Sequence, residues 1–141
     1  PQNYREAMYW ARRAELGGIK KAKFLADDIG DLTTDDQYDE ICERIKIDLI
    51  KEIDAGAISV LPQLASFHVT LLEDRDYEQA YVWFSLAVAL DLPELEERRS
   101  EMATELDIEQ LAKLQKETGR LFDALLAGES LEVMLGPAQK E

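Results

Sequence analysis

The sequence has one cysteine and one histidine among its 141 residues. A single cysteine excludes an internal disulfide, and a single histidine excludes catalytic and metal sites built on several histidines. Only four prolines and seven glycines are present, which favours helices over a turn-rich β fold. No apolar run approaches the roughly 20 residues that a membrane-spanning helix needs. The absences together favour an all-α protein without membrane insertion.

Basic residues are also few: 16 lysines and arginines face 30 aspartates and glutamates, a net charge of -14. This deficit argues against sequence-independent binding to nucleic acid or to anionic lipid. It favours a basic partner. Residues 1–26 nevertheless hold six bases and two acids, whereas residues 27–43 hold eight acids and no base. The sequence therefore predicts a basic patch at the N-terminal end of an acidic molecule.

Apolar residues recur at helical spacing along almost the whole chain, and no segment alternates as a strand does. The residues well suited to cap helices are Thr33 or Thr34, Asp76, and Asp107, the last opening a capping box with Gln110. The expected helices cover about 4–16, 19–29, 35–55, 59–72, 77–90, 93–106 and 108–127. The pattern predicts seven helices joined by tight turns.

A short motif occurs twice at a constant offset of 73 residues. Tyrosine, alanine, tryptophan and a second alanine coincide between the two copies, which are Tyr4, Ala7, Trp10, Ala14 and Tyr77, Ala80, Trp83, Ala87. An offset of 73 is two periods of about 36, so a degenerate middle copy is expected between them. A repeat of that length with two helices predicts an α-solenoid.

The motif Tyr-x-x-Ala-x-x-Trp, followed by alanine one turn later, resembles the first helix of a Sel1-like repeat, a relative of the tetratricopeptide repeats. The resemblance spans about 3–122 and is most specific at 76–115, where Arg99 and the segment Leu106–Leu111 also fit bacterial Sel1-like proteins. Asp91 departs from it, because the family usually has glycine there. The resemblance implies a non-enzymatic adaptor or scaffold.

The predicted fold is an all-α solenoid of about three helix-hairpin Sel1-like repeats. Its units are about 3–32, 34–73 and 76–106, followed by a capping helix at 107–127 within a domain of 1–128, and by a C-terminal tail at 129–141. Alanines allow close helix crossing, and we expect Trp10 and Trp83 to fill equivalent wedges between hairpins. Replacing either tryptophan by alanine is then expected to cost roughly 3–5 kcal/mol.

Candidate catalytic and metal-binding residues are few. We expect His68 to be a packed and hydrogen-bonded histidine of the core or its rim, and Cys42 to be an inert thiol that is buried or half-buried. A Cys42–His68 nucleophile pair across adjacent helices is the remaining enzymatic alternative. The acidic run from Asp27 to Glu40 does not fit a calcium-binding loop and is expected to be a solvated loop with helix-capping acids. No cofactor and no metal are expected.

Candidate protein-binding residues lie on the first helix of the first and last units, away from the packed seam. They are Arg5, Tyr9, Arg12, Arg13, Glu78, Tyr81, Val82 and Ser85. Tyrosine and arginine often carry binding energy at interfaces. The first helix has no cover before it, so we expect its outer face to contact either a partner or a second copy of the chain, giving a homodimer.

The favoured function is a protein-interaction module that binds a partner protein through its concave helical surface. The alternative is an acidic immunity or inhibitor protein that neutralises a basic toxin or enzyme by electrostatically steered association. The single cysteine, together with an opening Pro-Gln of the kind that removal of an initiator methionine leaves, favours a cytoplasmic location, with the periplasm as the alternative.

Overall fold

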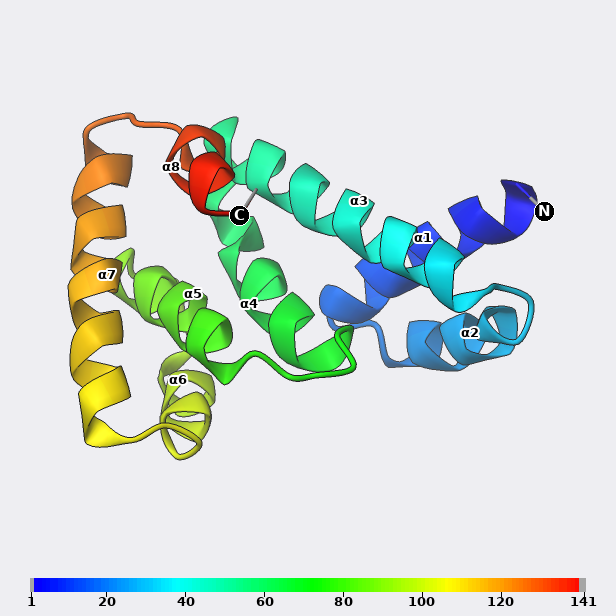
Figure 1. Cartoon of the computed structure of the whole chain (residues 1–141), viewed down its shortest axis with the longest axis horizontal. Coiled ribbons are helices and arrows are strands. Elements are labelled where there is room, and N and C mark those ends of the chain that lie inside the picture. Colours follow the sequence, from blue (N-terminus) through cyan, green and yellow to red (C-terminus); the bar gives the residue numbers. More distant parts are fainter. Residues whose placement is uncertain (1, 140–141) are drawn as a thin grey trace.

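The computed structural model describes residues 2–139, with side chains from Asn3 to Gly136. Within these limits the chain is helical throughout and contains no strand, which confirms the all-α prediction. The elements are α1 (Gln2–Leu16), α2 (Lys20–Gly30), α3 (Asp35–Asp54), the short 3-10 helix η1 (Ile58–Val60), α4 (Leu61–Thr70), α5 (Tyr77–Ala89), α6 (Glu96–Ala103), α7 (Ile108–Leu126) and α8 (Leu131–Gln139). Figure 1 shows α2 at one end of the molecule and α7 at the other.

Two capping boxes set the starts of the long helices α3 and α7. The Thr34 hydroxyl accepts the Gln37 backbone N–H at 3.1 Å, and the Gln37 side chain accepts the Thr34 N–H at 3.0 Å. Asp107 and Gln110 make the same reciprocal pair at 2.8 and 2.9 Å. Each pair satisfies two N–H groups that have no partner within the helix. The two boxes are 73 residues apart, so the offset found in the motif also relates α3 to α7.

The backbone conformation of Asp91, in the turn after α5, explains why Sel1-like repeats usually have glycine at this position. Gly18 follows α1 with φ +93, and Asp91, which lies 73 residues later, follows α5 with φ +64. This left-handed region suits glycine and is tolerated by aspartate because its short side chain bonds locally. The chain therefore makes the same kind of helix stop at both places with different residues.

Helix α5 is the centre of the hydrophobic core. Every residue from Ala80 to Ala87 is buried, and α5 packs against α4, α6 and α7. A helix that is apolar on all sides is stable in water only when neighbours cover all of it. Neither α5 nor any other helix in residues 2–139 is long and apolar enough to cross a membrane.

The two tryptophans do not have equivalent surroundings, and the prediction that they do is wrong. Trp83 is 2% exposed on α5, whereas Trp10 is 60% exposed on α1 and only its edge contact with Tyr9 is aromatic, at 4.8 Å between ring centroids. Helix α1 instead buries Met8, Tyr9 and Ala11. The buried face of α1 is therefore turned away from the predicted face.

The physical reason lies in the neighbours of each helix. Helix α1 packs against α2 and α3, which correspond by offset to α6 and α7 beside α5, and it also contacts α4. Helix α4 covers another side of α5, whereas no such helix covers the Trp10 face of α1 within the described residues. Trp10, Ala7 and Ala14 lie on the face without such a cover.

The expected tail at 129–141 is largely helical in the structure, because α8 packs against α3. The Asp54 carboxylate at the end of α3 accepts the Leu131 N–H at 2.7 Å, the Glu132 N–H at 3.0 Å and the Ser130 hydroxyl at 2.9 Å. Leu131 is fully buried. Asp54 thus acts as an N-cap supplied from far along the chain, and it joins the C-terminal segment to the middle of the molecule.

Replacing the two tryptophans by alanine should give unequal losses of stability. We expect Trp83→Ala to lower the free energy of unfolding by about 3–5 kcal/mol, because it leaves a cavity in the core. Trp10→Ala should cost less than about 1 kcal/mol, as at other exposed sites. Urea unfolding followed by circular dichroism measures both, and similar losses would contradict the assigned surroundings.

Asp54→Ala should loosen α8 selectively. We expect a loss of about 0.5–2 kcal/mol, which is typical of removing an N-cap, and faster amide hydrogen exchange in α8 than in α7. Asp74→Ala removes an exposed loop carboxylate without a hydrogen bond in the described structure and serves as the matched control. Unchanged exchange in α8 of the Asp54 variant would show that packing alone holds this helix.

Candidate functional site

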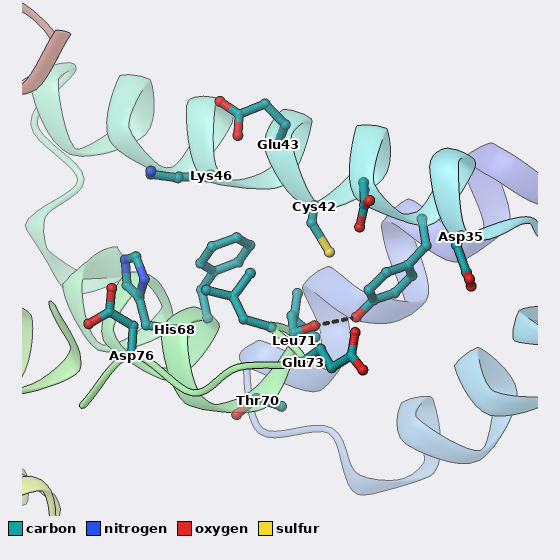
Figure 2. A pocket seen from close by; sticks show the side chains of 13 residues that line it. Asp35, Cys42, Glu43, Lys46, His68, Thr70, Leu71, Glu73 and Asp76 are labelled. Atoms are coloured by element: carbon teal, nitrogen blue, oxygen red, sulfur yellow. Dashed lines mark hydrogen bonds between the residues drawn. The ribbon is translucent and has the colours of Figure 1, made fainter. Parts of the chain in front are cut away.

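A large hollow in the described part of the molecule is a cleft between α3, α4 and the segment 71–76 (Figure 2). Its volume is about 900 Å³. Its lining residues are Asp35, Tyr38, Asp39, Cys42, Glu43, Lys46, Phe67, His68, Thr70, Leu71, Leu72, Glu73 and Asp76. The α3 residues Asp35, Asp39 and Glu43 follow one another at a spacing of four, so they share one face of that helix.

Hydrogen bonds fix the far wall of the cleft. The Tyr38 hydroxyl of α3 donates to the Leu71 carbonyl at 2.7 Å, which ties α3 to the end of α4. The Asp76 N–H donates to the His68 carbonyl at 3.0 Å, and the Asp76 carboxylate accepts the Gln79 N–H at 3.0 Å to cap α5. The connector 71–76 is therefore held at both ends.

The cleft is strongly acidic around an apolar floor. Five carboxylates line it, those of Asp35, Asp39, Glu43, Glu73 and Asp76, against one ammonium group, that of Lys46. The floor includes the buried side chains of Phe67 and Leu71. Carboxylates crowded beside a low-dielectric surface concentrate cations there.

His68 is buried in this cleft, as the sequence predicts, with 4% of its surface exposed. The expectation that it is also hydrogen-bonded is wrong, because neither ring nitrogen has a partner among the described residues; the ring instead packs edge-on against Phe67 at 5.2 Å. The pKa of His68 is lowered from 6.5 to about 4, chiefly by burial; the charge of Asp76 opposes the decrease, and Lys46 adds a smaller one. The imidazole is therefore neutral at pH 7 and presents one donor and one acceptor.

The geometry does not favour a Cys42–His68 nucleophile pair. No hydrogen bond joins the two side chains, which lie at different places along the cleft (Figure 2). Burial raises the pKa of the Cys42 thiol, although Tyr38 and Arg12 oppose this. A nucleophilic cysteine needs the opposite shift. Among residues 2–139, no group of histidine, cysteine and carboxylate side chains is placed to hold a metal ion.

The predicted binding residues of α1 are mostly engaged within the molecule. Tyr9 is 2% exposed and donates its hydroxyl to Asp48, and Arg13 binds Glu52 through two contacts of 2.8 Å. Arg12 contacts Glu15 at 2.7 Å and Asp27 at 3.5 Å. Arg5 alone remains exposed, at 3.4 Å from Glu40. The expected N-terminal basic patch is thus largely neutralised by acids of α1, α2 and α3.

The predicted binding residues of α5 are also inside. Tyr81, Val82 and Ser85 are buried because α5 is covered on all sides, and Glu78 accepts a hydrogen bond from the Gln110 side chain at 2.8 Å. The structure therefore does not bring the two predicted sets together as one free surface. The cleft residues were available from the sequence only in part, as the i, i+4, i+8 acids of α3.

Acid should destabilise the native protein through His68. The imidazole takes up a proton near pH 6.5 when unfolded and near pH 4 when folded, so the unfolded chain binds more protons between these values. Stability contributed by the neutral ring is lost as the pH falls through this window, by about 3 kcal/mol in total. Urea unfolding of the wild type and His68→Leu between pH 7 and pH 4 isolates this loss as a growing difference. Parallel pH profiles would show that burial does not perturb His68.

Comparison with known proteins adds no assignment: no family model, curated protein or solved structure matches the chain. The resemblance to Sel1-like repeats stays a prediction carried by the motif residues.

Proposed function

We propose that the protein is a non-enzymatic interaction module that holds a basic, partly apolar segment of a partner protein in the cleft between α3 and α4. The observation that carries the proposal is that five carboxylates and only one lysine surround the apolar floor of the cleft. Lysine and arginine side chains match such a surface, because their aliphatic stems pack on apolar groups while the charged ends reach carboxylates.

The neutral His68 fits the same role. A buried imidazole with two unpartnered nitrogens gains most from a polar group that comes with the bound segment. The cleft replaces the predicted concave surface as the contact region, since most of the predicted residues are engaged inside the molecule.

The resemblance to Sel1-like repeats supports the broader part of the proposal, a bacterial adaptor or scaffold built from helix pairs. The recurrence of the helix stop and of the capping box at the offset of 73 supports the same assignment. The uncovered face of α1 around Trp10 supports a second contact, with a partner or with another copy of the chain. A cytoplasmic location, with the periplasm as the alternative, belongs to this proposal.

The alternative function is an inhibitor or immunity protein for a basic toxin or enzyme. The net charge of -14 favours it, because long-range attraction accelerates association with a basic protein. An inhibitor of this kind would use the whole acidic surface, whereas the module needs the cleft. The two functions therefore differ in where a charge change matters.

Charge reversal in the cleft should weaken the binding of basic peptides more than charge reversal elsewhere on the surface. Peptides selected from a random display library on the wild-type protein are expected to combine lysine or arginine with apolar residues. Their affinity for Asp39→Lys/Glu43→Lys should fall by about tenfold or more, equal to about 1.4 kcal/mol or more. Asp39 and Glu43 line the cleft, and both are exposed. Neither side chain makes a hydrogen bond within the described structure.

The control variant is Asp123→Lys/Glu105→Lys, which makes the same change in net charge at exposed residues outside the cleft. Equal loss in both variants would favour the inhibitor-like use of total charge. An association rate that falls steeply with added salt in both variants would point the same way. Selected peptides without basic residues, or full affinity in the cleft variant, would contradict the module.

A further inference from the structure

A second, smaller hollow has the opposite chemistry to the acidic cleft. It is a groove of about 440 Å³ that residues of α5, α6 and α7 line. These three helices lie at the end of the molecule opposite α2 (Figure 1). Its lining residues are Tyr81, Ser85, Ala89, Arg99, Ser100, Ala103, Gln115 and Thr118. None of these residues is acidic, although the chain has 30 acids among 141 residues. The groove is therefore an acid-free site on an acidic protein.

Arg99 supplies the charge of the groove. It is half-buried, and it takes part in none of the ion pairs within the described residues. Its neighbour Arg98 differs, because Arg98 reaches Glu101 at 3.7 Å and lies over the Phe84 ring at 4.8 Å. A guanidinium presents a planar fork of donors that matches the two oxygens of a carboxylate. Arg99 is the arginine of α6 that has this fork available.

Ser85 is the second independent observation. It is 8% exposed, lines the groove from α5, and its Oγ has no hydrogen-bond partner in the described structure. A buried hydroxyl without a partner is unfavourable unless a ligand or another polar group satisfies it. Thr118 differs, since its hydroxyl donates to the Leu114 carbonyl at 2.8 Å. The groove thus combines an unpaired cation with an unsatisfied hydroxyl.

We propose that this groove binds a carboxylate group, with Arg99 as the charged contact and with the Ser85 hydroxyl and the Gln115 amide as further donors. The carboxylate belongs either to a small organic acid or to the acidic side chains of a peptide. This site is separate from the cleft between α3 and α4, which attracts cations, so the inference does not depend on the proposed function.

The test follows the Arg99 side-chain Nε–H and the Ser85 amide by nuclear magnetic resonance during titration. Succinate represents the small acid, a capped Ala-Asp-Asp-Ala peptide represents acidic side chains, and inorganic phosphate is the third arm. We expect saturable shifts at both groups with at least one of the two carboxylate probes, and the tighter of them identifies the source. No saturable shift with either, or tighter binding of phosphate than of both, would overturn the proposal.

Substitutions at the two adjacent arginines separate the site from general charge. Arg99→Gln should weaken binding of the better probe by about tenfold or more, and Arg99→Lys should recover only part of the loss because lysine lacks the fork. Arg98→Gln makes the same charge change on the same helix and should leave the affinity within about twofold. Equal weakening by Arg98→Gln and Arg99→Gln would reduce the effect to net charge and refute a built site.

Discussion

Helix α5 is the constraint on which the rest of the structure depends. Every residue from Ala80 to Ala87 is buried, so α4, α6 and α7 must cover this part of the helix together. This requirement places α7 across one side and α4 along another, and it gathers the C-terminal half of the chain around one element. It also explains why Tyr81, Val82 and Ser85, which were chosen as a binding surface on α5, are buried.

The helices were predictable from sequence because their starts and stops are local. Thr34, Asp76 and Asp107 cap the helices that were expected to follow them, and Asp91 adopts the conformation that glycine favours. The exposure of Trp10 was not predictable in this way, because it depends on which helices lie beside α1. Helix α1 carries two apolar seams at helical spacing, and only the packing against α2 and α3 selects the one containing Met8.

The binding residues of α1 were misjudged for a related reason. Arginines near the N-terminus are surface groups by their sequence neighbours, but their acidic partners lie elsewhere in the chain, such as Glu52 for Arg13. Only the acidic residues that α3 contributes to the cleft could be grouped from the sequence. Asp35, Asp39 and Glu43 share a helix face by spacing alone, whereas Glu73 and Asp76 join them only because α4 returns the chain to α3. No local sequence pattern predicts the packing of α4 against α3.

The same helix α5 separates two sites of opposite preference. Asp76 caps its N-terminus, lines the acidic cleft and donates its N–H to the His68 carbonyl, so the cleft wall is anchored to the core. Further along α5, Ser85 lines the acid-free groove beside Arg99. Because α5 is packed on all sides, neither wall can shift freely without disturbing the core. The buried helix α5 thus keeps a site suited to cations apart from a site suited to carboxylates. This separation lets a short chain with a large excess of acid keep Arg99 in the groove without an ion pair to one of its own carboxylates.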